Sequence, residues 1–171
     1  NLEKQGLVKV HYVKLKADGH IDTEYLHELL TKYDNVLVSL MHANNEIGNM
    51  IDLEEIGAIC HEHKALFHSD TVQTVGQYKI DLSHGKVDFI SASAHKFNGP
   101  KGVGFIYIRS GINFCPLIIG GGQERSLRGG TENILGIAAM AAALKMNIDK
   151  LYQRQPYING LKEYFISQLK E

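Results

Sequence analysis

Residues 87–96 are Val87-Asp88-Phe89-Ile90-Ser91-Ala92-Ser93-Ala94-His95-Lys96, a run in which half of the residues are apolar and which ends in histidine and lysine. A short run of this kind is typical of a strand buried within a sheet. Asn98-Gly99-Pro100 follows and predicts a turn immediately afterwards. The sequence therefore predicts a lysine at the carboxyl end of a buried strand, next to an imidazole and close to a hydroxyl.

The segments on either side of this stretch alternate between predicted strands and predicted helices. Strands are predicted at residues 8–15, 36–41, 65–69 and 103–108. The first alternates apolar and polar residues and is expected to be half exposed, whereas residues 36–41 are almost continuously apolar and are expected to be covered on both faces. Helices are predicted from Asp22 to about Thr31, from Asp52 onwards, from Thr131 to about Ile148, and from Pro156 to Leu169. This order predicts an α/β fold in three layers, with a mostly parallel sheet.

The composition is that of an ordinary globular protein. The chain has 171 residues, of which 44% are hydrophobic and 22% charged, and its net charge is -1. Neither nucleic acid nor a membrane is expected as a partner, because the charge is balanced and no apolar run approaches the ~20 residues of a membrane span. The two cysteines, Cys60 and Cys115, form no disulfide framework and favour a reducing, cytoplasmic setting.

Lys96 is the first candidate for chemistry. Ligands of parallel α/β sheets bind beyond the carboxyl ends of the strands, which is where Lys96 is predicted to lie. A lysine that forms a Schiff base must lose its proton near neutral pH, and a cationic neighbour such as His95 favours that loss. The hydroxyl of Ser93 and the imidazole of His95 would suit a phosphate group. The alternative is a surface lysine with no special role.

Asp70 is the second candidate. It follows the short predicted strand at residues 65–69 and is either a helix cap or a carboxylate for the pyridine nitrogen of a cofactor. Gln73 lies three residues further on, within reach of the same ring. Asn45 offers an amide donor for a ring hydroxyl, although it also suits a turn. Thr131 is predicted to cap the long helix, and helix N-termini also bind phosphate.

Two other groups are not expected to form sites. Cys60-His61-Glu62-His63 contains metal-binding residue types, but helical residues one or two positions apart do not face each other. We therefore predict no metal site. Cys115 has no neighbour that would lower a thiol pKa, and we interpret it as structural.

The order and spacing of these motifs resemble the cysteine desulfurases of the class V aminotransferase family, which are pyridoxal-phosphate (PLP) enzymes of fold type I. The matching stretches are residues 42–48, 68–73, 87–96, 99–102, 120–125 and 128–133. The resemblance implies that Lys96 carries PLP covalently and that Asp70 pairs with its pyridine nitrogen. It also implies that Gln73 and Asn45 contact the ring-hydroxyl side.

The resemblance further implies the remaining contacts and the reaction. Ser93 and His95 would bind the cofactor phosphate, and Thr131 would reach the phosphate bound in a partner subunit, which implies a homodimer. The substrate would be L-cysteine, which would be converted to L-alanine. Its sulfur would pass to an enzyme cysteine and then to an acceptor scaffold protein for iron–sulfur cluster assembly or other sulfur transfer.

The family's nucleophilic cysteine and its carboxylate-binding arginine lie in a later region that has no counterpart here. We therefore expect an internal fragment, inactive alone, with residues 1–149 forming part of the large PLP-binding domain and residues 150–171 starting the small domain. Two alternatives remain open. One is a selenocysteine lyase or another class V lyase or aminotransferase, and the other is a non-catalytic interaction domain of the same fold.

Overall fold

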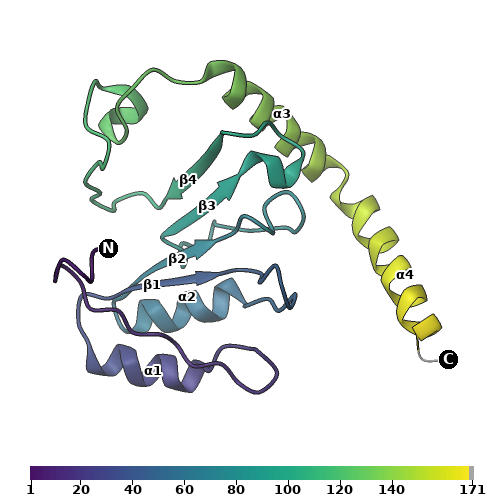
Figure 1. Ribbon diagram of the computed structural model, residues 1–171, viewed down its shortest axis with the longest axis horizontal. Helices are drawn as coiled ribbons and strands as arrows, with labels where there is room; N and C mark the ends of the chain where they lie inside the picture. Colours follow the sequence, from purple (N-terminus) through teal and green to yellow (C-terminus); the bar gives the residue numbers. More distant parts are fainter. Residues whose placement is uncertain (170–171) are drawn as a thin grey trace.

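A four-stranded sheet forms the centre of the computed structural model, which describes residues 1–169 (Figure 1). The strands are β1 (Leu37–Met41), β2 (Leu66–Asp70), β3 (Phe89–Ser93) and β4 (Gly104–Ile108), in that spatial order. β1, β2 and β3 are parallel, and β4 is antiparallel to β3. The predicted mostly parallel sheet is therefore confirmed.

Two helices cover one face of the sheet (Figure 1). They are α1 (Thr23–Lys32) and α2 (Leu53–Glu62), and they begin where the sequence predicts. The Asp22 carboxylate accepts a hydrogen bond from the Tyr25 amide, and the Asp52 carboxylate accepts bonds from the amides of Glu54 and Glu55. These bonds satisfy amides in the first turn that have no partner within the helix. Apolar side chains of both helices bury against the strands, and the residues at the centre are Leu26, Ile56 and Phe67.

The opposite face of the sheet is largely open within residues 1–169. Leu37 pairs with Leu66 in the β1–β2 ladder, so their side chains point to the same face. Leu37 is 57% exposed and Leu66 is 38% exposed. The expectation that residues 36–41 are covered on both faces is wrong for this part of the chain, since only the face of Val38 is covered.

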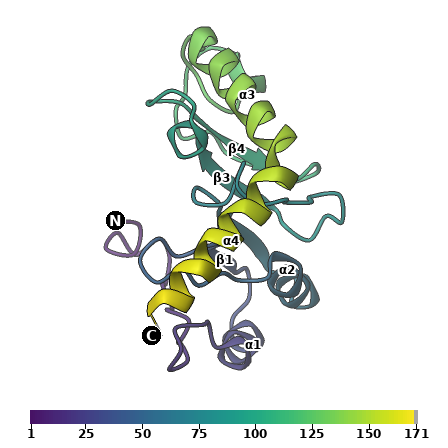
Figure 2. The ribbon, with the colours of Figure 1, turned by 90° about the vertical axis from the view of Figure 1, so that its right-hand side faces the viewer.

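Helices α3 (Ile134–Asp149) and α4 (Leu151–Leu169) follow the sheet, and α4 projects away from it (Figures 1 and 2). α3 is capped by Asn133, whose side chain accepts a bond from the Gly136 amide, so the prediction that Thr131 is the cap is wrong. An asparagine caps a helix at least as well as a threonine. No helix within residues 1–169 is long and apolar enough to span a membrane.

α4 begins five residues before Pro156, where the sequence predicted its start. Proline favours the first turn of a helix, but here tertiary contacts hold the preceding turn in place. Arg154 donates to the side chain of Asn147 and to the carbonyl of Gly76. These long-range bonds stabilise a turn that local sequence does not predict.

The strand predicted at residues 8–15 is absent. Leu15 forms only an isolated bridge with Ile21, and Tyr12 is 85% exposed. The segment instead contacts α1 and its C-cap, where His11 stacks on Tyr33 and the Lys14 ammonium lies 3.9 Å from the ring centroid of Tyr25. Alternating residues form a strand only where a neighbouring strand satisfies the backbone.

Candidate functional site

Three parallel strands bring the predicted site residues to one edge of the sheet. Asp70 is the last residue of β2 and pairs with Met41 on one side and Ser91 on the other. Ser93 ends β3, and Asn45 lies in the loop after β1. Because parallel strands end at the same edge, these residues and the turn that carries Lys96 share the carboxyl edge of the sheet.

A short 3-10 helix, η1 (Ala94–Phe97), presents His95 and Lys96 to solvent. Ala94 and Phe97 are fully buried, which turns the two residues between them outward. The chain then reverses at Asn98, whose φ is 65°, and the Gly99 amide donates to the Ala94 carbonyl at 2.8 Å. A side chain at Gly99 would lie 2.8 Å from the Ala94 Cβ, so this turn requires glycine.

Ser93 and His95 form a polar pair beside this turn. The Ser93 Oγ lies 2.8 Å from the His95 Nδ1, and the serine is half-buried whereas the histidine is exposed. A hydroxyl and an imidazole held together in this way can both donate to one phosphate group. Their bond also restricts the rotation of each side chain.

Asp70 uses one carboxylate oxygen locally. Its Oδ1 accepts a hydrogen bond from the Val72 amide at 2.9 Å, whereas its Oδ2 has no hydrogen-bond partner within residues 1–169. The side chain is half-buried. Asp70 therefore stabilises the turn after β2 and still offers an oxygen to a protonated ring nitrogen, so the two predicted roles are compatible.

His68 is a residue that the sequence analysis missed. It precedes Asp70 by two positions and shares its face of the sheet, with Nδ1 2.8 Å from the Ser39 Oγ and Nε2 3.3 Å from the Ser91 Oγ. Burial lowers the pKa of His68, although the Asp70 carboxylate opposes that effect. The His68 imidazole therefore links three strands next to Asp70. The sequence could have indicated this position, because residues 68 and 70 of one strand point to the same face of the sheet.

Asn45, Gln73 and Thr131 are less constrained. Asn45 is exposed and donates to the Glu46 carboxylate, while the neighbouring Asn44 side chain accepts from two amides and forms the turn. Gln73 is half-buried in the turn after Asp70. Thr131 is exposed in the loop before α3, and no hydrogen bond joins it to the other candidate residues within the described range.

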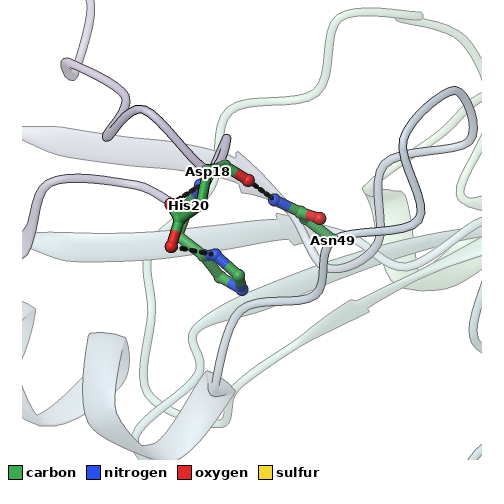
Figure 3. Close-up of polar contacts among 3 residues, drawn as sticks. All are labelled: Asp18, His20 and Asn49. Atoms are coloured by element: carbon green, nitrogen blue, oxygen red, sulfur yellow. Dashed lines mark hydrogen bonds and ion pairs between the residues drawn. The ribbon is translucent and has the colours of Figure 1, made fainter.

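The loop that carries Asn45 is anchored to the N-terminal segment (Figure 3). The Asn49 side chain donates to the Asp18 carbonyl at 2.8 Å, and the Asp18 carboxylate lies 3.2 Å from the His20 Nδ1. These residues line a cavity of about 510 Å³ that reaches the end of β1 at Met41. The bond from Asn49 to Asp18 therefore fixes the loop to the N-terminal segment.

The two cysteines differ in their exposure. Cys60 is buried on α2, and burial, assisted by the charge of Asp88, raises the pKa of its thiol to about 12. Cys115 is exposed, so its interpretation as a structural residue gains no support from packing. It lies in the long loop between β4 and α3.

The chain is similar to known proteins over almost its whole length. The sequence profile described as aminotransferase class-V matches residues 1–171. Cysteine desulfurase IscS of Dictyoglomus turgidum is 42% identical over 170 residues, which are 99% of this chain and 43% of that protein. The chain thus spans less than half the length of this relative.

Solved structures give the same result. The NifS-like protein of Rickettsia africae superposes with a TM-score of 0.87 and 38% identity, over 92% of this chain and 44% of that one. A structure of SspA in complex with cysteine has a TM-score of 0.79 and 37% identity, over 84% of this chain and 42% of that one. From the profile match and these similarities, the chain belongs to the class-V aminotransferase family.

Proposed function

We propose that the protein containing this chain is a PLP-dependent cysteine desulfurase and that Lys96 holds the cofactor. The observation that carries the proposal is the position of Asp70 at the carboxyl end of β2 and of Lys96 just beyond the carboxyl end of the adjacent parallel strand β3. The ammonium of Lys96 has no ion-pair or hydrogen-bond partner within residues 1–169, and Asp70 keeps one free oxygen. An aromatic ring with an aldehyde and a basic nitrogen matches both groups.

The donor set at the edge fits PLP. Asp70 would accept a hydrogen bond from the protonated pyridine nitrogen and hold that proton in place. Ser93 and His95 would donate to the phosphate, and Asn45 and Gln73 would contact the ring-hydroxyl side. When bound, PLP supplies an electron sink for bonds at the substrate carbon. Lys96 would hold the cofactor and move protons at that carbon.

L-cysteine is the proposed substrate. The IscS and NifS-like names of the relatives support it, as does the complex of SspA with cysteine. We also propose a homodimer in which the exposed Thr131 contacts the phosphate held by the partner subunit, and an acceptor protein that takes the sulfur.

Lys96 can be tested directly on the full-length protein. Reduction with borohydride followed by peptide mass analysis should place a pyridoxyl group on Lys96, and Lys96→Ala should abolish both this adduct and alanine production from cysteine. Lys79→Ala removes another exposed lysine and should leave both unchanged. An adduct on a different lysine would refute the assignment, and the absence of any adduct would favour a non-catalytic domain.

The choice of substrate needs a separate measurement. Alanine production should be faster with cysteine than with other amino acids, and a preference for selenocysteine would instead identify a selenocysteine lyase. Residues 1–171 alone should release no more alanine than free PLP, because the family's nucleophilic cysteine and carboxylate-binding arginine have no counterpart in this segment and Cys60 is buried. Turnover by this segment above that of free PLP would refute its inactivity.

A further inference from the structure

The structure brings together three possible metal ligands from α1 and the end of α2. His27 lies in the middle of α1, Glu62 is the last residue of α2, and His63 is its C-cap. One ligand atom from each residue lies within 4.8 Å of the others. We propose that this group, the α1–α2 histidine cluster, binds a divalent transition-metal ion, with Zn²⁺ as the best match.

The spacing of the two imidazoles is close to that of a zinc site. The His27 Nδ1 lies 3.1 Å from the His63 Nε2. Two nitrogens that bind one zinc ion at ~2.0–2.1 Å with tetrahedral geometry are about 3.3 Å apart. The ring planes are inclined at 67°, edge to face, so the two nitrogens approach each other without stacking of the rings. The separation of the two nitrogens therefore differs from that in a zinc site by only a few tenths of an ångström.

A hydrogen bond between the two histidines would also explain the 3.1 Å separation of their nitrogens. The presence of Glu62 beside them favours a metal site over a simple hydrogen bond. A histidine pair needs no carboxylate, yet a Glu62 carboxylate oxygen lies within 4.8 Å of one ring nitrogen of each histidine. Its side chain is exposed and can rotate, so it can approach the shared point without a change in the backbone. Water can complete the fourth position on this open surface.

The ligand types select the kind of ion. Two imidazoles and one carboxylate suit zinc and its neighbours in the first transition row, whereas calcium and magnesium prefer oxygen ligands. The site also lies at the C-terminal end of α2, where the helix dipole favours a cation. An ion there would join α1 to α2 and stabilise the layer that covers the sheet.

This cluster lies away from the proposed PLP site. β2 begins at Leu66, shortly after His63, whereas Asp70 ends the same strand. The sequence prediction of no metal site considered only neighbours within residues 60–63. His27 lies 36 positions before His63, and only the packing of α1 on α2 brings the two imidazoles together.

The proposal can be tested by isothermal titration calorimetry, in which zinc chloride is titrated into the metal-free full-length protein. Wild type should bind one zinc equivalent that is lost or weakened in His27→Ala and in His63→Ala. Loss of an outer-shell partner alone costs ~10–100-fold in metal affinity, so loss of a ligand should cost at least about tenfold. Glu62→Gln should weaken binding while leaving the two histidines in place. His61→Ala is the matched control, because His61 is an exposed histidine on α2 outside the cluster.

A thermal unfolding scan gives a second readout that does not depend on enzyme activity. Zinc should raise the Tm of wild type and of His61→Ala, and this increase should disappear in His27→Ala and His63→Ala. The zinc-free Tm of each variant shows whether it folds, and Glu62→Gln tests the site even if a histidine variant does not fold. The proposal would be overturned if wild type did not bind zinc, or if Glu62→Gln or the histidine variants bound zinc as tightly as wild type does. It would also be overturned if His61→Ala lost as much zinc affinity as the histidine variants of the cluster.

Discussion

The helix-covered face of the sheet and its carboxyl edge are built from different kinds of contact. On the covered face, Phe67, Leu26 and Ile56 are at most 2% exposed and belong to one apolar cluster. At the carboxyl edge, His95 and Lys96 are exposed, and the contacts are single hydrogen bonds such as that between Ser93 and His95. Apolar burial therefore supplies stability on the covered face, while the edge keeps polar groups available for a ligand.

A cavity in the covered face should have the largest effect. Phe67→Ala removes a fully buried ring and should lower the free energy of unfolding by about 3–5 kcal/mol. Chemical unfolding of the full-length protein measures this loss. Leu66→Ala on the open face should cost clearly less, because that side chain is 38% exposed. If both variants lost the same free energy of unfolding, the contrast between the covered and the open face would fail, because both faces would then be packed in the whole protein.

At the edge, a substitution should affect chemistry more than stability. Asp70→Asn removes the charge proposed to hold the ring proton and should lower kcat/KM for cysteine by about 10²–10³-fold, as when one preorganised active-site hydrogen bond is lost. Steady-state assays of alanine measure this loss, and the Tm should change little. Asp81→Asn changes an exposed carboxylate and should leave kcat/KM unchanged. A large loss of Tm with unchanged kcat/KM would assign Asp70 to structure alone.

The helix cap of α2 should have a smaller effect. Asp52→Ala removes the acceptor of two first-turn amides and should destabilise the protein by about 1 kcal/mol. Urea unfolding measures this loss of stability. Asp34→Ala, at an exposed position outside the helices, should stay within about 0.5 kcal/mol of wild type. A similar loss from Asp34→Ala would mean that general charge, and not capping, determines the effect.

The smallest effect should be a pH dependence from His42. This imidazole is 7% exposed and lies 2.8 Å from the Thr74 Oγ1; burial lowers its pKa, and the Asp52 carboxylate partly opposes that shift. The unfolded chain therefore takes up a proton near pH ~6.5 that the folded chain takes up only at lower pH. Stability should fall as the pH drops below about 6.5.

His42→Gln should reduce this pH dependence in thermal scans between about pH 5 and 8. The slope should not vanish, because burial also lowers the pKa of His68. Scans of wild type and His42→Gln with identical slopes would show that His42 does not contribute.

Local patterns predicted the fold where the deciding contacts are themselves local. Asp22 and Asp52 cap helices through amides two or three residues away, and the apolar run at residues 87–93 contains β3. The same reasoning failed for residues 8–15 and for the start of α4. Residues 8–15 could form a strand only beside a neighbouring strand, and they have only an isolated bridge at Leu15. The first turn of α4 depends on bonds from Arg154 to Gly76 and Asn147.

The sequence alone determined the alternation of strands and helices, the caps of α1 and α2, and the position of Lys96 in a turn after a strand. These features depend on backbone bonds and side-chain periods that span a few residues. Only the tertiary structure decided which distant side chains touch, as when His27 approaches His63. Such encounters depend on how whole elements pack, and no local pattern encodes that packing.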